Sequence, residues 1–196
     1  MPLVTIPDKG FSTTERAALV TVAESYNNGY TKTLTAAADV LDADNLACST
    51  KGAFCARFKL KRRTNATWGL AYFRVNGAQT NLQHSGFYTV NGGDKTANSA
   101  SGTAPLVAPC QDAGVAGVWW SVEVSCPAPE ETLANRRFYV NACQPLNAVT
   151  GTYNTVEYEY VYKGLGEIVS VGVYDTDNNV DGTEIDAGSY VVVTRI

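Results

Sequence analysis

The sequence has little charge and few of the residues that mark enzyme active sites. Charged residues make up 17% of its 196 residues, and it contains one histidine. About a quarter charged is usual for a soluble globular protein. It has no G-x-x-x-x-G-K-[ST] loop, no G-x-G-x-x-G fingerprint and no G-x-S-x-G elbow. Common signatures of nucleotide binding and serine hydrolysis are therefore missing, and a hydrolase that uses His84 beside Ser85 is retained only as a second alternative.

Charge of one sign and long apolar runs are also scarce. The formal net charge of −4 is small, and its sign argues against a general nucleic-acid binder. The first residues lack the basic region, apolar run and cleavage site of a secretory signal. No apolar run approaches the roughly 18 residues that span a bilayer. We therefore expect synthesis in a cytoplasm, with neither a membrane nor nucleic acid as partner.

The cysteines do not form a metal-binding or redox motif. There are five, at positions 48, 55, 110, 126 and 143, and no two are spaced as C-x-x-C, which argues against a zinc ribbon or a thioredoxin-like site. Cys48 and Cys55 flank a short loop and are the candidates for a disulfide. Buried reduced thiols are the alternative.

Alternation of apolar and polar residues predicts a mainly β protein. Strands are expected at 54–63, 68–75, 86–90, 118–126, 136–143, 156–163, 167–175 and 189–196, the first two as a hairpin. Ser12 and Glu15 form a capping box that predicts an N-terminal α-helix over about 13–26. Residues 31–47 fit helix by propensity but also allow a strand. We expect a single domain over 1–196, an antiparallel sandwich or distorted barrel of about eight strands.

Two segments are expected to make contacts between subunits. Residues 91–109 are small and polar with glycine and proline, which predicts a long loop or arm. The final strand, SYVVVTRI, reaches the last residue of the sequence, so we expect its edge to be paired within its own sheet or by a neighbour.

An acidic loop near the C-terminus predicts a possible Ca²⁺ site. Oxygen donors recur around Gly182, and DNNVDG matches the start of a calcium loop. The candidate ligands are Asp175, Asp177, Asn179, Asp181 and Glu184. The pattern departs from an EF-hand afterwards. The twelfth position, counted from Asp177, is Gly188 and not glutamate, and the flanking segments are predicted as strands and not helices. A solvated hairpin loop without metal is the alternative, and no other cofactor is expected.

Alternating strand residues supply candidate contact surfaces. Adjacent tryptophans on a strand point to opposite faces, so one of the pair must meet a second layer or a neighbour. A basic strand face and an acidic, tyrosine-rich strand could set the register between subunits. The candidate interface residues are Arg57, Lys59, Lys61, Trp119, Trp120, Tyr158, Tyr160 and Tyr190.

In overall character, across its whole length, the chain resembles small structural proteins of tailed-bacteriophage particles. The features that carry this resemblance are an uncharged polar surface, 11 tyrosines, a β-rich pattern and the absence of catalytic signatures. The resemblance implies a non-enzymatic protomer of the virion, a capsid decoration, tail or neck protein that contacts copies of itself and other virion proteins. It assigns no residue a role. The alternative from another class is a Ca²⁺-dependent carbohydrate-binding β-sandwich that uses Trp119, Trp120 and the acidic loop.

Overall fold

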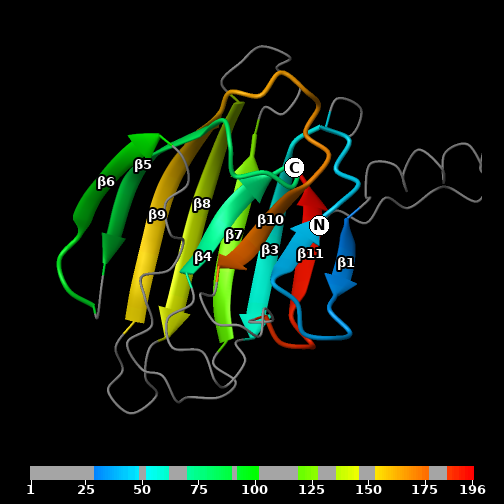
Figure 1. The fold of residues 1–196 in the computed structure, drawn as a ribbon, viewed down its shortest axis with the longest axis horizontal. Coiled ribbons are helices and arrows are strands. Elements are labelled where there is room, and N and C mark those ends of the chain that lie inside the picture. The colour runs from blue at the N-terminus through cyan, green and yellow to red at the C-terminus, as the bar shows by residue number, and fades with distance from the viewer. Residues whose placement is uncertain are drawn as a thin grey trace, which may run out of the picture.

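The protein folds into two antiparallel β-sheets that pack face to face (Figure 1). The computed structural model describes residues 29–48, 52–61, 70–89, 92–101, 119–127, 136–145, 153–176 and 185–196. These residues form eleven strands, eight in one sheet and three in the other. We call them the large sheet and the small sheet. Within these residues, no helix has the length and apolar character needed to cross a membrane.

The strand order of each sheet differs from the chain order. The large sheet runs β1 (Tyr30–Thr33), β11 (Tyr190–Arg195), β3 (Phe54–Lys61), β7 (Trp119–Cys126), β8 (Arg136–Pro145), β9 (Tyr153–Tyr162), β5 (Leu82–Thr89) and β6 (Thr96–Ser101). The small sheet runs β2 (Val40–Ala43), β10 (Val171–Thr176) and β4 (Leu70–Val75).

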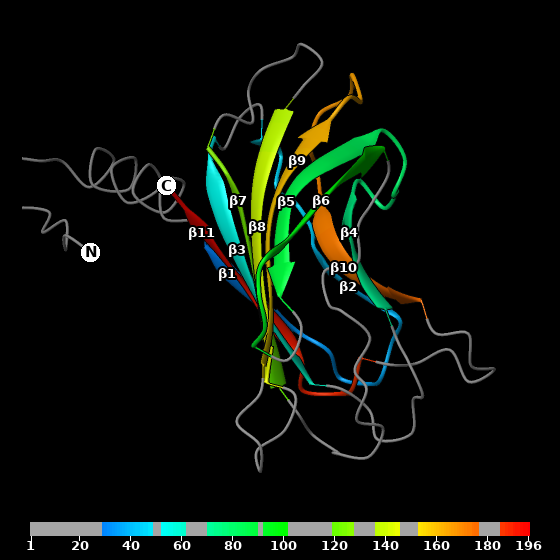
Figure 2. The same cartoon turned by 90° about the vertical axis from the view of Figure 1, so that its left-hand side faces the viewer.

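The core lies between the two sheets. Alternate residues of β3, β7, β8 and β9 are buried, so one side of each strand supplies the core. Phe73 of the small sheet packs against two rings of the large sheet, with centroids 5.3 Å from Phe138 and 4.9 Å from Tyr160. Period-two alternation is the pattern that lets a strand bury one side and expose the other. Seen edge-on, the small sheet covers one side of the large sheet (Figure 2).

The predicted mainly β fold is confirmed in its sandwich form. The large sheet does not close into a barrel, because the described strands at its two ends, β1 and β6, each pair with one neighbour only. Residues 31–47 contribute strands β1 and β2, so tertiary pairing outweighs the helix propensity of the alanines there. The expected N-terminal helix at 13–26 lies outside the described residues.

Two expectations about pairing need correction. The hairpin of 54–63 with 68–75 is wrong, because β3 and β4 lie in different sheets. Part of the expected 91–109 loop, Thr96–Ser101, forms β6 and pairs with β5.

The final strand pairs within its own sheet, which is one of the two expected alternatives. It is not an edge, because β11 lies between β1 and β3 and pairs with both.

Candidate interaction face

The side of the large sheet turned away from the small sheet carries the candidate functional surface, which we call the outer face. The strands align so that one row of outward side chains crosses all eight strands. In spatial order the row is Thr31, Val192, Arg57, Glu123, Asn141, Glu157, Phe87 and Ala97. No described strand packs over this row (Figure 2).

Three large aromatic side chains are exposed on the outer face. Phe87 is 47% exposed, Trp119 is 43% exposed and Tyr139 is 44% exposed. They come from β5, β7 and β8, whose inward-facing neighbours are core residues. Aromatic residues are enriched where proteins contact one another, because each ring buries a large area at a small entropic cost.

Three ion pairs join residues across the same face, and two of them link neighbouring strands. The Arg57 guanidinium lies 2.7 Å from Glu123 on β7, and this hydrogen bond raises the pKa of Arg57. Glu157 pairs with Lys95 at 2.8 Å. Arg137 of β8 and Glu159 of β9 lie 2.7 Å apart. Such exposed pairs contribute about 0–1 kcal/mol each, so they set the charge pattern of the face more than its stability.

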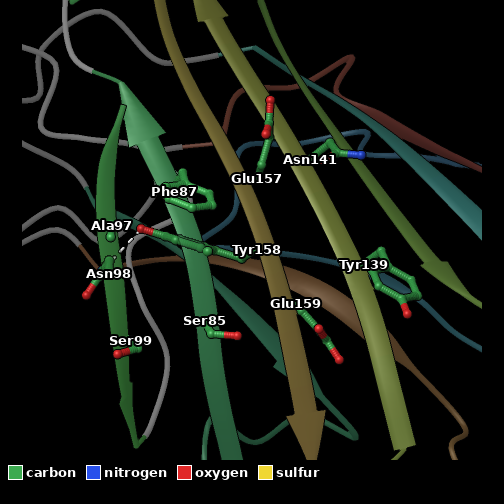
Figure 3. Close-up of a pocket in the computed structure, with 11 residues that line it drawn as sticks. Ser85, Phe87, Ala97, Asn98, Ser99, Tyr139, Asn141, Glu157, Tyr158 and Glu159 are labelled. Carbon is green, nitrogen blue, oxygen red and sulfur yellow. Dashed lines mark hydrogen bonds between the residues drawn. The ribbon is translucent and has the colours of Figure 1, made fainter. Parts of the chain in front are cut away.

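Two shallow hollows lie side by side on the outer face. The first has a volume of 600 Å³ and is lined by Ser85, Phe87, Tyr139, Glu157 and Glu159 among others (Figure 3). The second has a volume of 480 Å³ and shares Asn141 and Glu157 with the first. Polar and aromatic side chains on a broad open surface suit contact with another surface. Among the described residues, no three His, Cys, Asp or Glu side chains group to hold a metal ion.

The basic strand is placed as the sequence predicts. Arg57 and Lys59 are exposed and Lys61 is half-buried, while Phe58 and Leu60 are buried on the opposite side. Each cation has a polar neighbour within the chain. Lys59 donates to the Ser121 hydroxyl at 2.5 Å, and Lys61 lies 2.8 Å from Asp186.

The aromatic candidates divide between the two faces. Trp119 is exposed and Trp120 is 3% exposed, as expected for adjacent strand residues. Tyr190 is half-buried, and its ring centroid lies 6.4 Å from that of Trp119. Tyr158 and Tyr160 are buried in the core, so neither side chain lies on the surface where an interface contact was expected of it. Glu157 and Glu159, which alternate with these tyrosines along β9, reach the outer face instead.

His84 and Ser85 do not form a nucleophile and base pair. His84 is 6% exposed on the core side, with its ring centroid 5.4 Å from that of Tyr158. Ser85 is exposed on the outer face. Successive strand residues point to opposite sides of a sheet, which separates the imidazole from the hydroxyl.

The structure describes both cysteines of the candidate disulfide but only one of the five candidate Ca²⁺ ligands. Cys48 and Cys55 are free and buried, and burial raises the pKa of both thiols. Of the candidate Ca²⁺ ligands, Asp175 lies in β10. The other four, Asp177, Asn179, Asp181 and Glu184, lie outside the described residues. The Ca²⁺ site therefore stays a prediction.

Sequence reasoning missed most of the outer face. Phe87, Glu123, Tyr139 and Asn141 were not among the predicted contact residues. Each occupies an outward position in an alternating strand, so alternation could have found their side of the sheet. Their assembly into one row depends on the strand order, which alternation does not encode.

Comparisons with known proteins do not assign the chain to a family. No protein family matches the sequence, and no curated protein matches it. A solved structure, described as "Structure of infectious bursal disease virus Gx strain", aligns with 13% identity and a TM-score of 0.15. The alignment covers 100% of this chain and 41% of the matched chain. A TM-score this low does not establish a shared fold.

Proposed function

We propose that the protein is a non-enzymatic structural protomer of a virus particle, a phage capsid decoration, tail or neck protein, and that its outer face is the contact surface. The observation that carries this proposal is the outer face itself. It presents Phe87, Trp119 and Tyr139 at exposures of 43–47% on the side of the large sheet that no described strand covers, while the other side forms the core.

The chemistry of the face supports a binding role over catalysis. The outward carboxylates of β9, Glu157 and Glu159, are paired with Lys95 and Arg137. The one histidine of the chain points to the core. Exposed aromatic rings surrounded by paired charges are typical of surfaces that bury a flat partner.

The glycan-binding alternative loses part of its basis. A stacking platform of two adjacent tryptophans is not available, because Trp120 is buried at 3% exposure and packs in the core.

The proposal is tested by the binding of purified protein to particles isolated from its native source. We expect the wild-type protein to co-sediment with particles and a Tyr139→Arg variant to lose at least about nine-tenths of this binding, because a buried aromatic contact is replaced by a charge. Leu165→Arg is the matched control, since Leu165 is 78% exposed between β9 and β10. Absence of wild-type protein from the particles, or equal binding by Tyr139→Arg, would overturn the proposal.

A further inference from the structure

The row that crosses the outer face carries a cation and a carboxylate at equal distances from the seam between β7 and β8. Four strands of the large sheet lie on each side of this seam. Next to the seam, Glu123 of β7 lies in register with Asn141 of β8. One strand further out in the same row, β3 carries Arg57 and β9 carries Glu157. A surface with opposite charges at equal distances from a line matches a copy of itself rotated about that line.

We infer that the partner of the outer face is a second copy of this chain, packed face to face about a two-fold axis that runs parallel to the strands over the β7–β8 seam. This inference rests on the proposed function and names the partner of the same surface. A two-fold interface is isologous, so each contact occurs twice.

The strand register makes the pairing specific. Rotation about the seam places each strand of one copy over its counterpart on the other side of the seam in the second copy. In the row that crosses all eight strands, Arg57 then lies over Glu157 of the second copy, and Glu123 lies over Asn141. A cation faces a carboxylate, and a carboxylate faces an amide that can donate to it.

Apolar and size complementarity follow the same symmetry. Val192 and Phe87 lie two strands from β7 and β8 respectively in that row, so they face each other. In the next row, Tyr139 is paired across the seam with Ser125. The exposed tyrosine of one copy therefore meets the small serine of the other.

A different axis is disfavoured by charge. An axis in the plane of the face but perpendicular to the strands would place β3 over β3 and β9 over β9, so that cations face cations and carboxylates face carboxylates. Juxtaposed like charges cost several kcal/mol.

The outer face is large enough for a stable dimer. Eight strands spaced about 4.8 Å apart and three rows spaced about 6.7 Å apart give roughly 700 Å² in projection. A standard interface buries about 800 Å² per partner. The pairs within each chain do not prevent this contact, because exposed ion pairs of about 0–1 kcal/mol rearrange readily.

The symmetry is tested with two charge reversals, Arg57→Glu and Glu157→Arg, by sedimentation equilibrium. We expect the wild-type protein to dimerise and each variant alone to have a dimer dissociation constant raised at least about tenfold, since a like-charge pair appears twice in each homodimer. An equimolar mixture of the two variants should regain dimers. In the mixed dimer one contact has the reversed pair and the other has the original pair.

The matched control shifts the reversal by one row. The Glu159→Arg variant keeps the Arg57–Glu157 contact and should dimerise like the wild type. In a mixture with it, Arg57→Glu chains should enter fewer dimers than in the mixture with Glu157→Arg, because Glu157 of the second chain still faces the introduced glutamate. Thermal unfolding of every variant checks that the fold is retained. A wild-type protein that stays monomeric at its highest soluble concentration, or a mixture no tighter than its components, would overturn the two-fold pairing.

The two proposals can fail separately. Particle binding that depends on Tyr139 without the mixing effect would keep the structural function and remove the two-fold partner. Restored dimers in the mixture without any protein in particles would keep the partner and remove the function.

Discussion

Gly86 lies directly opposite Tyr158 in the β5–β9 ladder, and the tyrosine side chain crosses over the glycine to reach β6. Its hydroxyl accepts a hydrogen bond from the Asn98 amide at 3.1 Å (Figure 3). An aromatic ring that covers a glycine on a neighbouring strand shields the backbone there and fixes the strand register. The Tyr158 side chain therefore links β9 to β5 and β6, the two strands at that end of the large sheet.

A Gly86→Ala substitution should destabilise the protein by about 2–4 kcal/mol, because it combines overpacking with backbone strain. An added Cβ would lie 2.0 Å from the Glu157 carbonyl oxygen and 2.7 Å from Tyr158 Cδ1, at a φ of 156°. Thermal unfolding should show a midpoint lowered by roughly 5–12 °C for a chain of this size. Gly166→Ala is the control, since a Cβ there meets nothing within 4 Å. Equal midpoints for the two variants would contradict this account.

The sequence predicts strands well and their partners poorly. Alternation in 54–63 correctly separates Arg57 from Phe58, because burial of one strand side is a local property of the pattern. The same pattern does not show that β3 pairs with β7 and β11 while β4 joins the other sheet. Those choices depend on contacts between residues far apart in the chain, such as Phe73 with Phe138. The tyrosines of β9 illustrate the limit, since alternation separates them from the glutamates but does not show which set is buried.

The small sheet contains an ion pair that bridges a glycine. Asp42 and Arg74 flank Gly172 in register from β2 and β4, and the Arg74 Nε lies 2.8 Å from the Asp42 Oδ1. Their side chains are 16% and 17% exposed. A Cβ on Gly172 would lie 1.8 Å from the Asp42 Oδ1, so the glycine leaves the space that the carboxylate occupies.

A double-mutant cycle of Asp42→Ala and Arg74→Ala should give a coupling energy of about 1–3 kcal/mol, because the pair is largely shielded from water and joined by more than one hydrogen bond. Chemical denaturation of the four proteins measures this energy. The same cycle on Arg57 and Glu123 is the matched control. That pair also joins two strands, but its side chains are 57% and 44% exposed, so its coupling should be about 0.2–1 kcal/mol. A larger coupling for the exposed pair would show that burial does not set these energies.

Two groups, the buried Cys48 thiol and the half-buried Tyr30 hydroxyl, should make the folded protein less stable in alkali. Burial raises the pKa of Cys48 from 9.0 to about 11, and burial together with Asp44 raises that of Tyr30 from 10.0 to about 12. Raised values mean that the fold favours the neutral forms. Their stabilising contribution is complete below pH 9 and is lost as the pH rises through 9 to 12. The free energy of unfolding should therefore fall over that range.

Alkylation at pH 8 followed by peptide mapping tests the thiols directly. The exposed Cys143 should react in the native protein, because the thiolate is the reactive form and needs access to the reagent. Cys48 and Cys55 should react only after unfolding in denaturant without reductant, since both are free and buried. The Cys143→Ser variant is the control, and it should remove the labelling at position 143 while leaving the labelling of Cys48 and Cys55 unchanged. If Cys48 and Cys55 instead stay unlabelled in denaturant until reductant is added, they form the disulfide that their spacing first suggested.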